Sequence, residues 1–423
     1  MNRVIHKSKM RGLVAIFIMT FSLMGGYSFF TGEAGSARWY LFYYGRFALM
    51  LLYALYSYTK RPPLQIRRMS EWIMKETVLP IALMLLYSFL LWGVQRARLP
   101  YISRGISDAI FMTGACITGA CMAKILGKKT LKYGLLSAVI TMLCAFVIGL
   151  VDLRGSFFTL ILSGSNKYVE LHETLYVIGL YLVCYMFTDR FFRRRRNIAL
   201  FLLGMLSFLV GGKRIGFAAL LLTAVFGMLL NRVDERSKTR VIRSVGWAML
   251  VLVLGFTAAS VTGALDELLL RLHISMSGRN VIYTYFRQFC TYSPAYLGRG
   301  LGFVGRQFDY TTRADLGNMV AIKALHNDLM KIYIDMGFVG SILWNWYYIK
   351  KLPSDLIKKI GAKGAFICFC LIIYSFITYT TDNTAWYLNY QMHLVMLMTA
   401  IGCGCLDVRE DASRDRRSRE PQR

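Results

Sequence analysis

The chain has 423 residues, of which 56% are hydrophobic, 14% are aromatic and 17% are charged, and its formal net charge is +28. This composition is too apolar for a soluble protein of this size. A nucleic-acid-binding protein would carry its positive charge on one face of a soluble fold, whereas here Lys and Arg fall in short clusters between apolar runs. Composition therefore excludes a soluble nucleic-acid-binding fold and predicts an all-α, polytopic membrane protein with no nucleic-acid partner.

Twelve apolar segments are candidates for membrane-spanning helices, because each approaches the length that crosses about 30 Å of hydrocarbon. In chain order they are Leu13–Phe30, Trp39–Tyr58, Thr77–Trp92, Ile106–Leu126, Tyr133–Val151, Leu171–Phe191, Asn197–Val210, Ile215–Leu230, Ser244–Thr262, Leu329–Ile349, Ala365–Thr380 and Trp386–Cys405. The seventh and eighth segments are short, which predicts a tight hairpin or a half-inserted turn. The first is longer than the usual signal-peptide core of about 7–15 residues. We interpret it as a retained span, although small residues around Ala34–Ala37 would permit cleavage.

Clusters of Lys and Arg recur on one side of these spans. With a cytoplasmic N-terminus, the clusters on that side are Lys60–Lys75, Lys124–Lys132, Arg190–Arg196, Arg232–Arg243, Lys350–Lys363 and the tail from Arg409. Because cytoplasmic loops carry an excess of cations, both termini are predicted to be cytoplasmic. The predicted parts are a transmembrane bundle of about nine spans (1–262), a large extracytoplasmic loop with short amphipathic helices (263–328), C-terminal transmembrane helices (329–405) and a charged cytoplasmic tail (406–423).

The predicted extracytoplasmic loop is the most unusual part of the chain, because a loop of this length in a compact protein is usually functional. Within it, apolar residues at helical spacing predict an amphipathic helix on the outer membrane face. They are Val281, Ile282, Tyr285, Phe286 and Phe289. Farther along, Gly298, Gly300 and Gly302 either turn the loop tightly or let its backbone approach a ligand.

His326, at the junction of this loop with the next span, is the leading candidate for acid–base chemistry, because imidazole has a pKa of about 6.5. His172 and His273 are outward alternatives with weaker context. Lys213 and Arg214 lie in a glycine-bounded turn on the same side. Headgroup anchoring is favoured for Lys213, whereas anchoring and function are balanced for Arg214.

Other arginines near the predicted outer face are interpreted mainly as headgroup anchors, although some could line a groove for an anionic lipid. They are Arg46, Arg96, Arg98 and Arg104.

No cofactor or metal is predicted. Of the nine cysteines, eight lie in predicted spans as small packing residues, and Cys290 alone cannot build a disulfide framework in the loop. The chain has no Asp-x-Asp motif and no phosphate-binding loop of the kind found in ATP-driven pumps. Loop carboxylates such as Asp266 and Glu267 leave a metal open, but their simpler role is to balance the arginines.

Three motifs occur in a fixed order between Gly211 and Gly340. They are Gly212-Lys213-Arg214 before an apolar span, Ser277-Gly278-Arg279 before the aromatic amphipathic segment, and the glycine stretch from Gly298 that leads to Ala324-Leu325-His326-Asn327 and on to Asp335-Met336-Gly337. This pattern resembles the O-antigen polymerase and O-antigen ligase superfamily, most of all its Wzy-type polymerases for O-antigen, capsule or exopolysaccharide. The chain departs from it at Lys213, where a small or hydroxyl residue is common, and at Asp335, where Glu is common.

The resemblance implies a glycosyltransferase of the bacterial inner (plasma) membrane that joins polyprenyl-diphosphate-linked oligosaccharide repeat units on the extracytoplasmic face. It assigns His326 as general base and Arg279 and Arg214 as the groups that bind and stabilise the diphosphate. The residues expected to contact substrate are Lys213, Arg299, Asn327 and Arg287. Expected partners are the lipid-linked donor and acceptor, membrane lipids, and chain-length regulator and flippase proteins.

Two alternatives stay open. A ligase, which transfers a finished glycan to a separate acceptor, would use nearly the same residues. A lipid-linked oligosaccharide flippase would concentrate its polar groups near the bilayer midplane and often contains repeats, whereas this chain concentrates them in the predicted outer loop. We therefore expect a polymerase.

Overall fold

The computed structural model describes residues 2–33, 35–60, 62–153, 156, 167–188, 195–231, 233–322 and 324–406. Within these ranges the regular structure is helical and contains no β-strand, which confirms the all-α prediction. Four apolar helical segments are long enough to cross a membrane, and three shorter ones accompany them. The long ones are Leu64–Val94, Leu99–Leu153, Glu235–Thr262 and Asp328–Tyr379, and the shorter ones are Met10–Met24, Asn197–Val210 and Arg214–Leu230. This is the make-up of a helical membrane protein, and a total of twelve spans stays a prediction.

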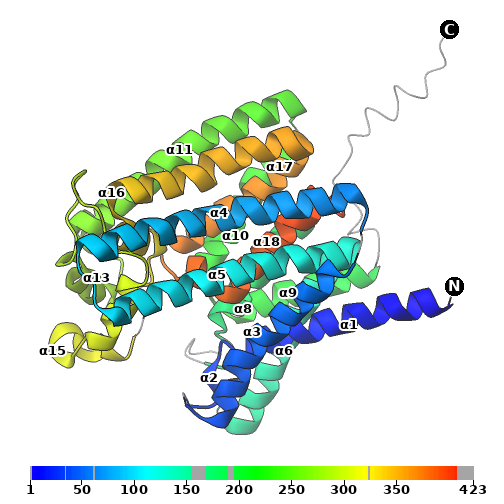
Figure 1. The fold of residues 1–423 in the computed structure, drawn as a ribbon, viewed down its shortest axis with the longest axis horizontal. Coiled ribbons are helices and arrows are strands. Elements are labelled where there is room, and N and C mark those ends of the chain that lie inside the picture. The colour runs from blue at the N-terminus through cyan, green and yellow to red at the C-terminus, as the bar shows by residue number, and fades with distance from the viewer. Residues whose placement is uncertain are drawn as a thin grey trace.

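The helices follow one another along the chain as Figure 1 shows. Their bounds are α1 Asn2–Met24, α2 Ser28–Thr31, α3 Ala37–Tyr58, α4 Leu64–Val94, α5 Leu99–Leu126, η1 Gly127–Lys129, α6 Thr130–Leu153, α8 His172–Met186, α9 Arg195–Val210, α10 Arg214–Asn231, α11 Glu235–Thr262, α12 Ala264–Arg271, α13 Arg279–Arg287, α14 Phe303–Gln307, η3 Phe308–Tyr310, α15 Arg313–Leu316, η4 Gly317–Ala321, α16 Asp328–Trp346, η5 Tyr347–Lys351, α17 Leu352–Tyr379, η6 Thr384–Trp386 and α18 Leu388–Gly402. Here η5 is a single π-helical turn, and the other η elements are 3-10 turns.

Helix ends differ from the predicted spans where polar residues or glycines intervene. The first helix ends at Met24, because a glycine pair follows it and the chain turns into the short α2. In contrast, α4 begins at Leu64, well before the predicted start at Thr77. Its first turns are polar and include an ion pair between Arg67 and Glu71, so hydropathy alone missed them. Residues 189–191 of the predicted sixth span and 407–423 of the predicted tail lie outside the described residues.

The short helices α9 and α10 do not pack along each other as a tight hairpin. Near the turn between them, the Phe208 and Phe217 rings lie 5.1 Å apart. Beyond the turn, both helices pack on α8. Each therefore covers a different part of the same central helix.

The centre of the bundle is formed by α8 and α18, whose side chains are almost all buried, and by the second half of α17, from Gly364 to Tyr379. Small residues let neighbouring helices come close to them. A Cβ on Gly119 of α5 would lie 2.2 Å from the carbonyl oxygen of Met392 in α18. Similarly, Gly134 of α6 makes room for the Tyr181 ring of α8. Close helix approach thus fixes the three helices that carry the site described below.

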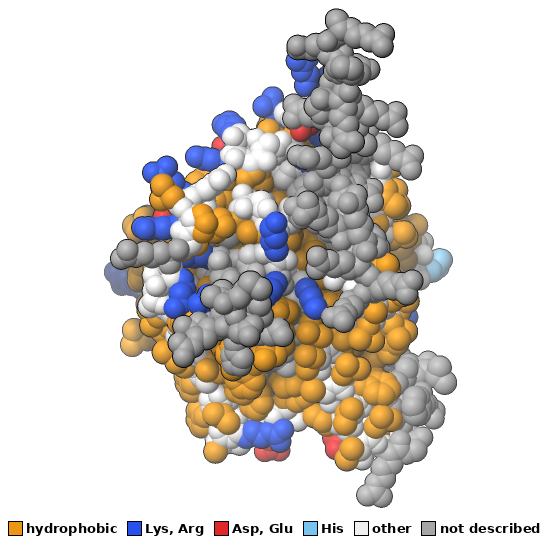
Figure 2. Space-filling model, turned by 90° about the vertical axis from the view of Figure 1, so that its right-hand side faces the viewer, with side chains coloured by type: hydrophobic (Ala, Val, Ile, Leu, Met, Phe, Trp, Pro, Cys, Tyr) orange, Lys and Arg blue, Asp and Glu red, His pale blue; other side chains and the backbone are white. Residues whose placement is uncertain are grey.

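The segment from α12 to η4 gathers at one end of the bundle, at the left of Figure 1, and the N-terminus lies at the other end. Figure 2 views the molecule from the N-terminal end, where Lys and Arg side chains stand out among hydrophobic ones. This separation of the loop from the basic end agrees with the charge pattern used to predict the topology.

Part of the predicted amphipathic helix in the loop is present as α13. It buries Ile282, Tyr283 and Phe286, while Val281 is exposed. The buried side chains pack with Leu325 and with residues of α16. The helix therefore fastens the loop to the end of the bundle.

The three closely spaced glycines bring the loop backbone against helices. All three have positive φ angles, which are +96° at Gly298, +88° at Gly300 and +83° at Gly302. A Cβ on Gly300 would meet the Trp92 indole at 2.3 Å, and one on Gly302 would meet the backbone of Gly105 at 2.5 Å. The predicted tight turn is present at Leu301–Gly302, where Phe303 N donates to the Gly300 carbonyl at 3.3 Å, and the close backbone approach that the structure shows is to protein.

The same glycine stretch supplies hydrogen-bond donors where α16 is interrupted. At Gly337 the helix has a φ of 74° and a ψ of −174°, so carbonyls in the preceding turn lose their helical partners. The Ile334 carbonyl accepts a hydrogen bond from Arg299 N at 3.0 Å, and the Asp335 carbonyl accepts one from Gly300 N at 2.8 Å. The loop is thereby hydrogen-bonded into the bundle.

We expect Gly298→Ala to destabilise the fold by roughly 1–3 kcal/mol more than Gly317→Ala, because its Cβ is overpacked. Both glycines have positive φ, but a Cβ on Gly298 would lie 2.5 Å from Gly337 N, whereas nothing lies within 4 Å of one on Gly317. The measurement is the free energy of unfolding in mixed detergent micelles. Equal losses in the two variants would contradict the packing described here.

Candidate functional site

A partly open cavity of about 610 Å³ lies beside the loop. Its walls come from the turn after α1, from α3 and α5, from the start of α8, and from the segments on either side of α16 and α17. Its ionisable lining consists of the histidines His172 and His326, the cations Arg46, Arg104 and Lys331, and the carboxylates Asp108 and Glu173. This volume is within the range of about 300–1,000 Å³ that is usual for ligand pockets.

Beneath one wall of the cavity lies Asp382, in the short connection between α17 and α18. Its side chain is only 3% exposed. Tyr176 donates a hydrogen bond to Oδ2 at 2.7 Å, Tyr387 donates one to Oδ1 at 2.9 Å, and the Asn383 amide donates another at 2.8 Å. Several donors therefore stabilise a carboxylate that is removed from solvent.

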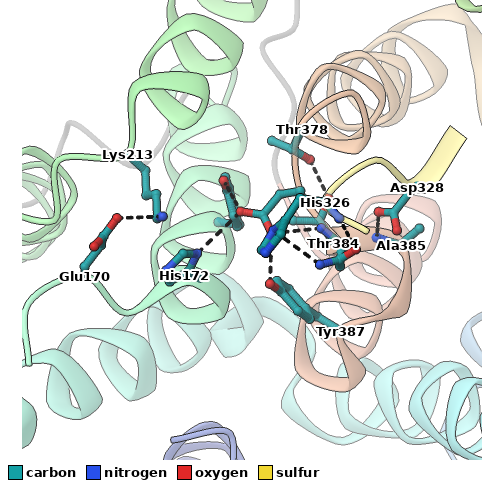
Figure 3. Close-up of polar contacts among 12 residues, drawn as sticks. Glu170, His172, Lys213, His326, Asp328, Thr378, Thr384, Ala385 and Tyr387 are labelled. Atoms are coloured by element: carbon teal, nitrogen blue, oxygen red, sulfur yellow. Dashed lines mark hydrogen bonds and ion pairs between the residues drawn. The ribbon is translucent and has the colours of Figure 1, made fainter. Parts of the chain in front are cut away.

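Two histidines lie on either side of this carboxylate (Figure 3). Nδ1 of His326 is 3.4 Å from Oδ1 of Asp382, and Nδ1 of His172 is 3.5 Å from Oδ2. Burial by itself would raise the pKa of Asp382, but hydrogen bonds and charge from the two histidines hold it well below the usual range. Asp382 therefore places its negative charge beside Nδ1 of both imidazoles, and the Asn383 side-chain nitrogen also lies 3.4 Å from Nδ1 of His326, so the contacts described for both rings are made through Nδ1.

The position of His326 is fixed through its main chain. It has a left-handed φ of 53°. Its amide donates to Oδ1 of Asn383 at 3.1 Å, and its carbonyl accepts from the Tyr283 hydroxyl at 3.1 Å. The next residue, Asn327, caps α16 by accepting from the Met330 amide at 2.9 Å. The histidine is thus held between the loop helix α13 and the connection that carries Asp382.

Three cations line the cavity from three different helices. Lys331 of α16 forms an ion pair with Asp335 at 2.9 Å and lies 3.6 Å from the Trp386 ring centroid. Arg104 of α5 forms an ion pair with Asp108 at 3.0 Å. Arg46 of α3 has a buried Nε with no hydrogen-bond partner among the described residues. Two of these cations are already paired with carboxylates, so Arg46 is the one that offers a buried, unused donor to a negatively charged ligand.

Of the predicted site residues, His326 lines the cavity and Asn327 is buried behind it as a helix cap. Arg279, the first residue of α13, lies one turn before Tyr283. Burial raises the pKa of Tyr283 to about 12, and the nearby charge of Arg279 opposes that rise. Arg279 is therefore next to the residue that holds the His326 carbonyl.

Lys213 and Arg214 lie on the His172 side of the site. Lys213 forms an ion pair with Glu170 at 2.7 Å, and Glu170 lies two residues before His172 (Figure 3). Arg214 begins α10 and is exposed. Neither residue is part of the cavity lining, so both lie outside the cavity on the His172 side.

The two remaining predicted contacts hold the loop together. Arg287 forms an ion pair with Asp266 at 2.7 Å and donates to the Ser260 carbonyl at 2.9 Å. Arg299 donates to the Phe289 carbonyl at 3.1 Å. These contacts give both arginines a structural role, and the Asp266 partner fits the predicted balance of charges.

Sequence reasoning missed Asp382 and Lys331, and it ranked His172 low. Asp382 lies in Thr380-Thr381-Asp382-Asn383-Thr384, a short polar stretch between the last two apolar segments, which was the available signal. Lys331 lies just inside a predicted span, where an ionisable residue is by itself an indication of function. Nothing in the sequence indicated that His172 and His326 share one carboxylate.

We expect Asp382→Asn to lower the free energy of unfolding by about 1–3 kcal/mol at neutral pH, because a buried, hydrogen-bonded carboxylate is lost. The native pKa is depressed, so this contribution is present above the unfolded pKa of about 3.9 and is lost as pH falls below it. Between pH 3 and pH 7, the melting temperature of the variant should therefore depend less on pH than that of the parent. The control is Asp309→Asn, which removes an exposed ion pair with Arg306; an equal effect there would overturn the assignment.

Comparisons with known proteins do not assign the chain to a family. No protein-family model matches the chain, and no curated protein matches it. The functional assignment therefore rests on the residues around the cavity and on the motifs between Gly211 and Gly340.

Proposed function

We propose that the protein is a polysaccharide polymerase of the bacterial plasma membrane, which joins polyprenyl-diphosphate-linked oligosaccharide repeat units on the extracytoplasmic face. The observation that carries the proposal is the His326–Asp382 pair beside a cavity with three cations. A histidine oriented by a buried carboxylate is suited to removing a proton from a hydroxyl near neutral pH. The motifs that resemble the O-antigen polymerase superfamily supply the substrate class.

In the proposed reaction, an acceptor sugar hydroxyl attacks the anomeric carbon of the donor glycan. Its proton passes to the free ring nitrogen of His326, while Asp382 stabilises the imidazolium that forms. A new glycosidic C–O bond is made, the bond from the anomeric carbon to the diphosphate oxygen breaks, and polyprenyl diphosphate leaves with the electron pair. ATP is not supplied outside the cytoplasm, so a donor that arrives already activated meets the energetic need.

The leaving diphosphate gains negative charge, and fixed cations near it would lower the barrier. Arg279 and Arg214 are proposed for this role. They are supported by their positions, one beside Tyr283 on the His326 side and one beside Lys213 on the His172 side. Within the cavity, Arg46 and Lys331 are proposed to contact the sugars or the diphosphate, because both line the same cavity as the two histidines.

We expect His326→Asn to reduce polymer formation by about 10²–10⁴-fold, the usual contribution of a general base. Asparagine tolerates the left-handed backbone of this position. The control is His273→Asn, because His273 has almost the same φ, 54°, but is exposed and outside the cavity lining. The assay incubates purified protein with lipid-linked repeat units and measures product length.

The product pattern separates the proposal from its rivals. A ladder of lengths indicates a polymerase, and a single transfer to a separate acceptor indicates a ligase. Movement of the intact lipid-linked oligosaccharide across a proteoliposome membrane without a new bond would indicate a flippase. If folded His326→Asn still makes the full ladder, the polymerase survives but the role of His326 is wrong.

We expect Arg279→Gln to reduce polymerisation by at least about tenfold at limiting donor, because one diphosphate contact of roughly 1.5–3 kcal/mol is removed. The matched control is Arg271→Gln, whose side chain is 80% exposed and 4.0 Å from its Glu267 partner. The measurement is the initial rate at several donor concentrations. Equal rates for the two variants would remove Arg279 from the diphosphate site.

A further inference from the structure

A second cavity lies between α1 and α3, at the opposite end of these helices from the site above. Its volume is about 570 Å³. On α3, Arg46 in the first cavity and Tyr56 in this one are ten residues apart, or about 15 Å along a helix. Of its lining residues, Met10 and Arg11 are the nearest to the start of α1, and Lys60 follows the end of α3. By the predicted topology, this is the cytoplasmic end.

Apolar side chains line the part of this groove away from Arg11 and Lys60, and two of them are exposed. They include Val14 and Leu52, which are 43% and 61% exposed, and Ile18 and Leu49 deeper along the two helices. In a membrane-embedded helix pair, such a surface faces lipid chains. The groove therefore offers an acyl chain a track of nearly two helical turns between α1 and α3.

Polar groups gather at one end of this track. Arg11 and Lys60 lie in the lining, and Nζ of Lys60 is 4.5 Å from the Tyr56 ring centroid. The hydroxyl of Tyr53 is buried and has no hydrogen-bond partner among the described residues. Two cations and an unsatisfied hydroxyl at the end of an apolar groove complement a phosphate that is joined to an acyl chain.

We propose that the groove between α1 and α3 binds an anionic glycerophospholipid, with its phosphate between Arg11 and Lys60 and one acyl chain along Val14, Ile18, Leu49 and Leu52. Charge complementarity selects this occupant, because a neutral chain would leave both cations without a counter-charge. The cytoplasmic leaflet is also where anionic headgroups attract basic residues near helix ends. The proposal does not depend on the polymerase assignment.

The test counts lipids retained by the purified full-length protein in native mass spectrometry, after transfer from nanodiscs of phosphatidylglycerol or phosphatidylcholine. We expect the parent to retain phosphatidylglycerol in preference to phosphatidylcholine. Arg11→Gln combined with Lys60→Gln should weaken this retention roughly tenfold. The matched control is Lys128→Gln combined with Lys132→Gln, which removes two exposed charges from the same predicted face and leaves the groove unchanged.

A variant with its charges intact tests the groove itself. Leu52→Trp fills the apolar track and should reduce phosphatidylglycerol retention as strongly as the double charge variant. Retention that is unchanged in Leu52→Trp, or lost equally in both double charge variants, would reduce the effect to general surface attraction and overturn the proposal. Complete displacement of the lipid by millimolar inorganic phosphate would likewise show that the site takes free phosphate and does not hold a lipid.

Discussion

The burial of one carboxylate organises the site of this protein. Asp382 is removed from solvent at the end of the bundle, where an isolated charge would be strongly unfavourable. Its oxygens are satisfied by Tyr176 from α8, by Tyr387 beside α18, and by two histidines from separate parts of the chain. Because every donor must reach the same small group, the requirement to satisfy Asp382 fixes how the ends of α8, α16, α17 and α18 meet.

A second set of contacts ties the loop to this arrangement. The break in α16 at Gly337 leaves carbonyls that the glycine stretch satisfies through Arg299 N and Gly300 N. The same helix begins one residue after the Asn327 cap and carries Lys331 into the cavity. Helix α16 therefore contacts the loop near Gly337, where the helix is interrupted, and contributes to the site at its N-terminal end. Displacing the loop would disturb the wall of the cavity.

Hydropathy was sufficient to predict the all-α class and the positions of most apolar helices, because burial in lipid or in a helical core imposes long apolar runs. It could not place helix ends where polar turns continue a helix, as in α4. For the site, His326 was singled out because it follows a long polar loop, and the structure places it in the lining of the cavity, while its role stays a prediction. Asp382 could not be paired with it from sequence, because the two positions are 56 residues apart in the chain and meet only through tertiary contacts, among them those of η6 with α16, α17 and α18. The roles of Arg214 and Arg279 stay predictions.

The connection that carries Asp382 is short and is fastened at several points. Asp328 accepts from the Ala385 amide at 2.7 Å, and Thr378 and Thr384 share a hydrogen bond at 2.7 Å. The adjoining half of α17, from Gly364 to Tyr379, and nearly all of α18 are buried. In the proposed polymerase, the acid–base pair would consequently be supported by the rigid core, whereas part of the cavity wall belongs to the separate loop. Under that proposal, loop residues outside the α16 contacts would be free to change, and with them the choice of sugar, while the proton-transfer geometry is preserved.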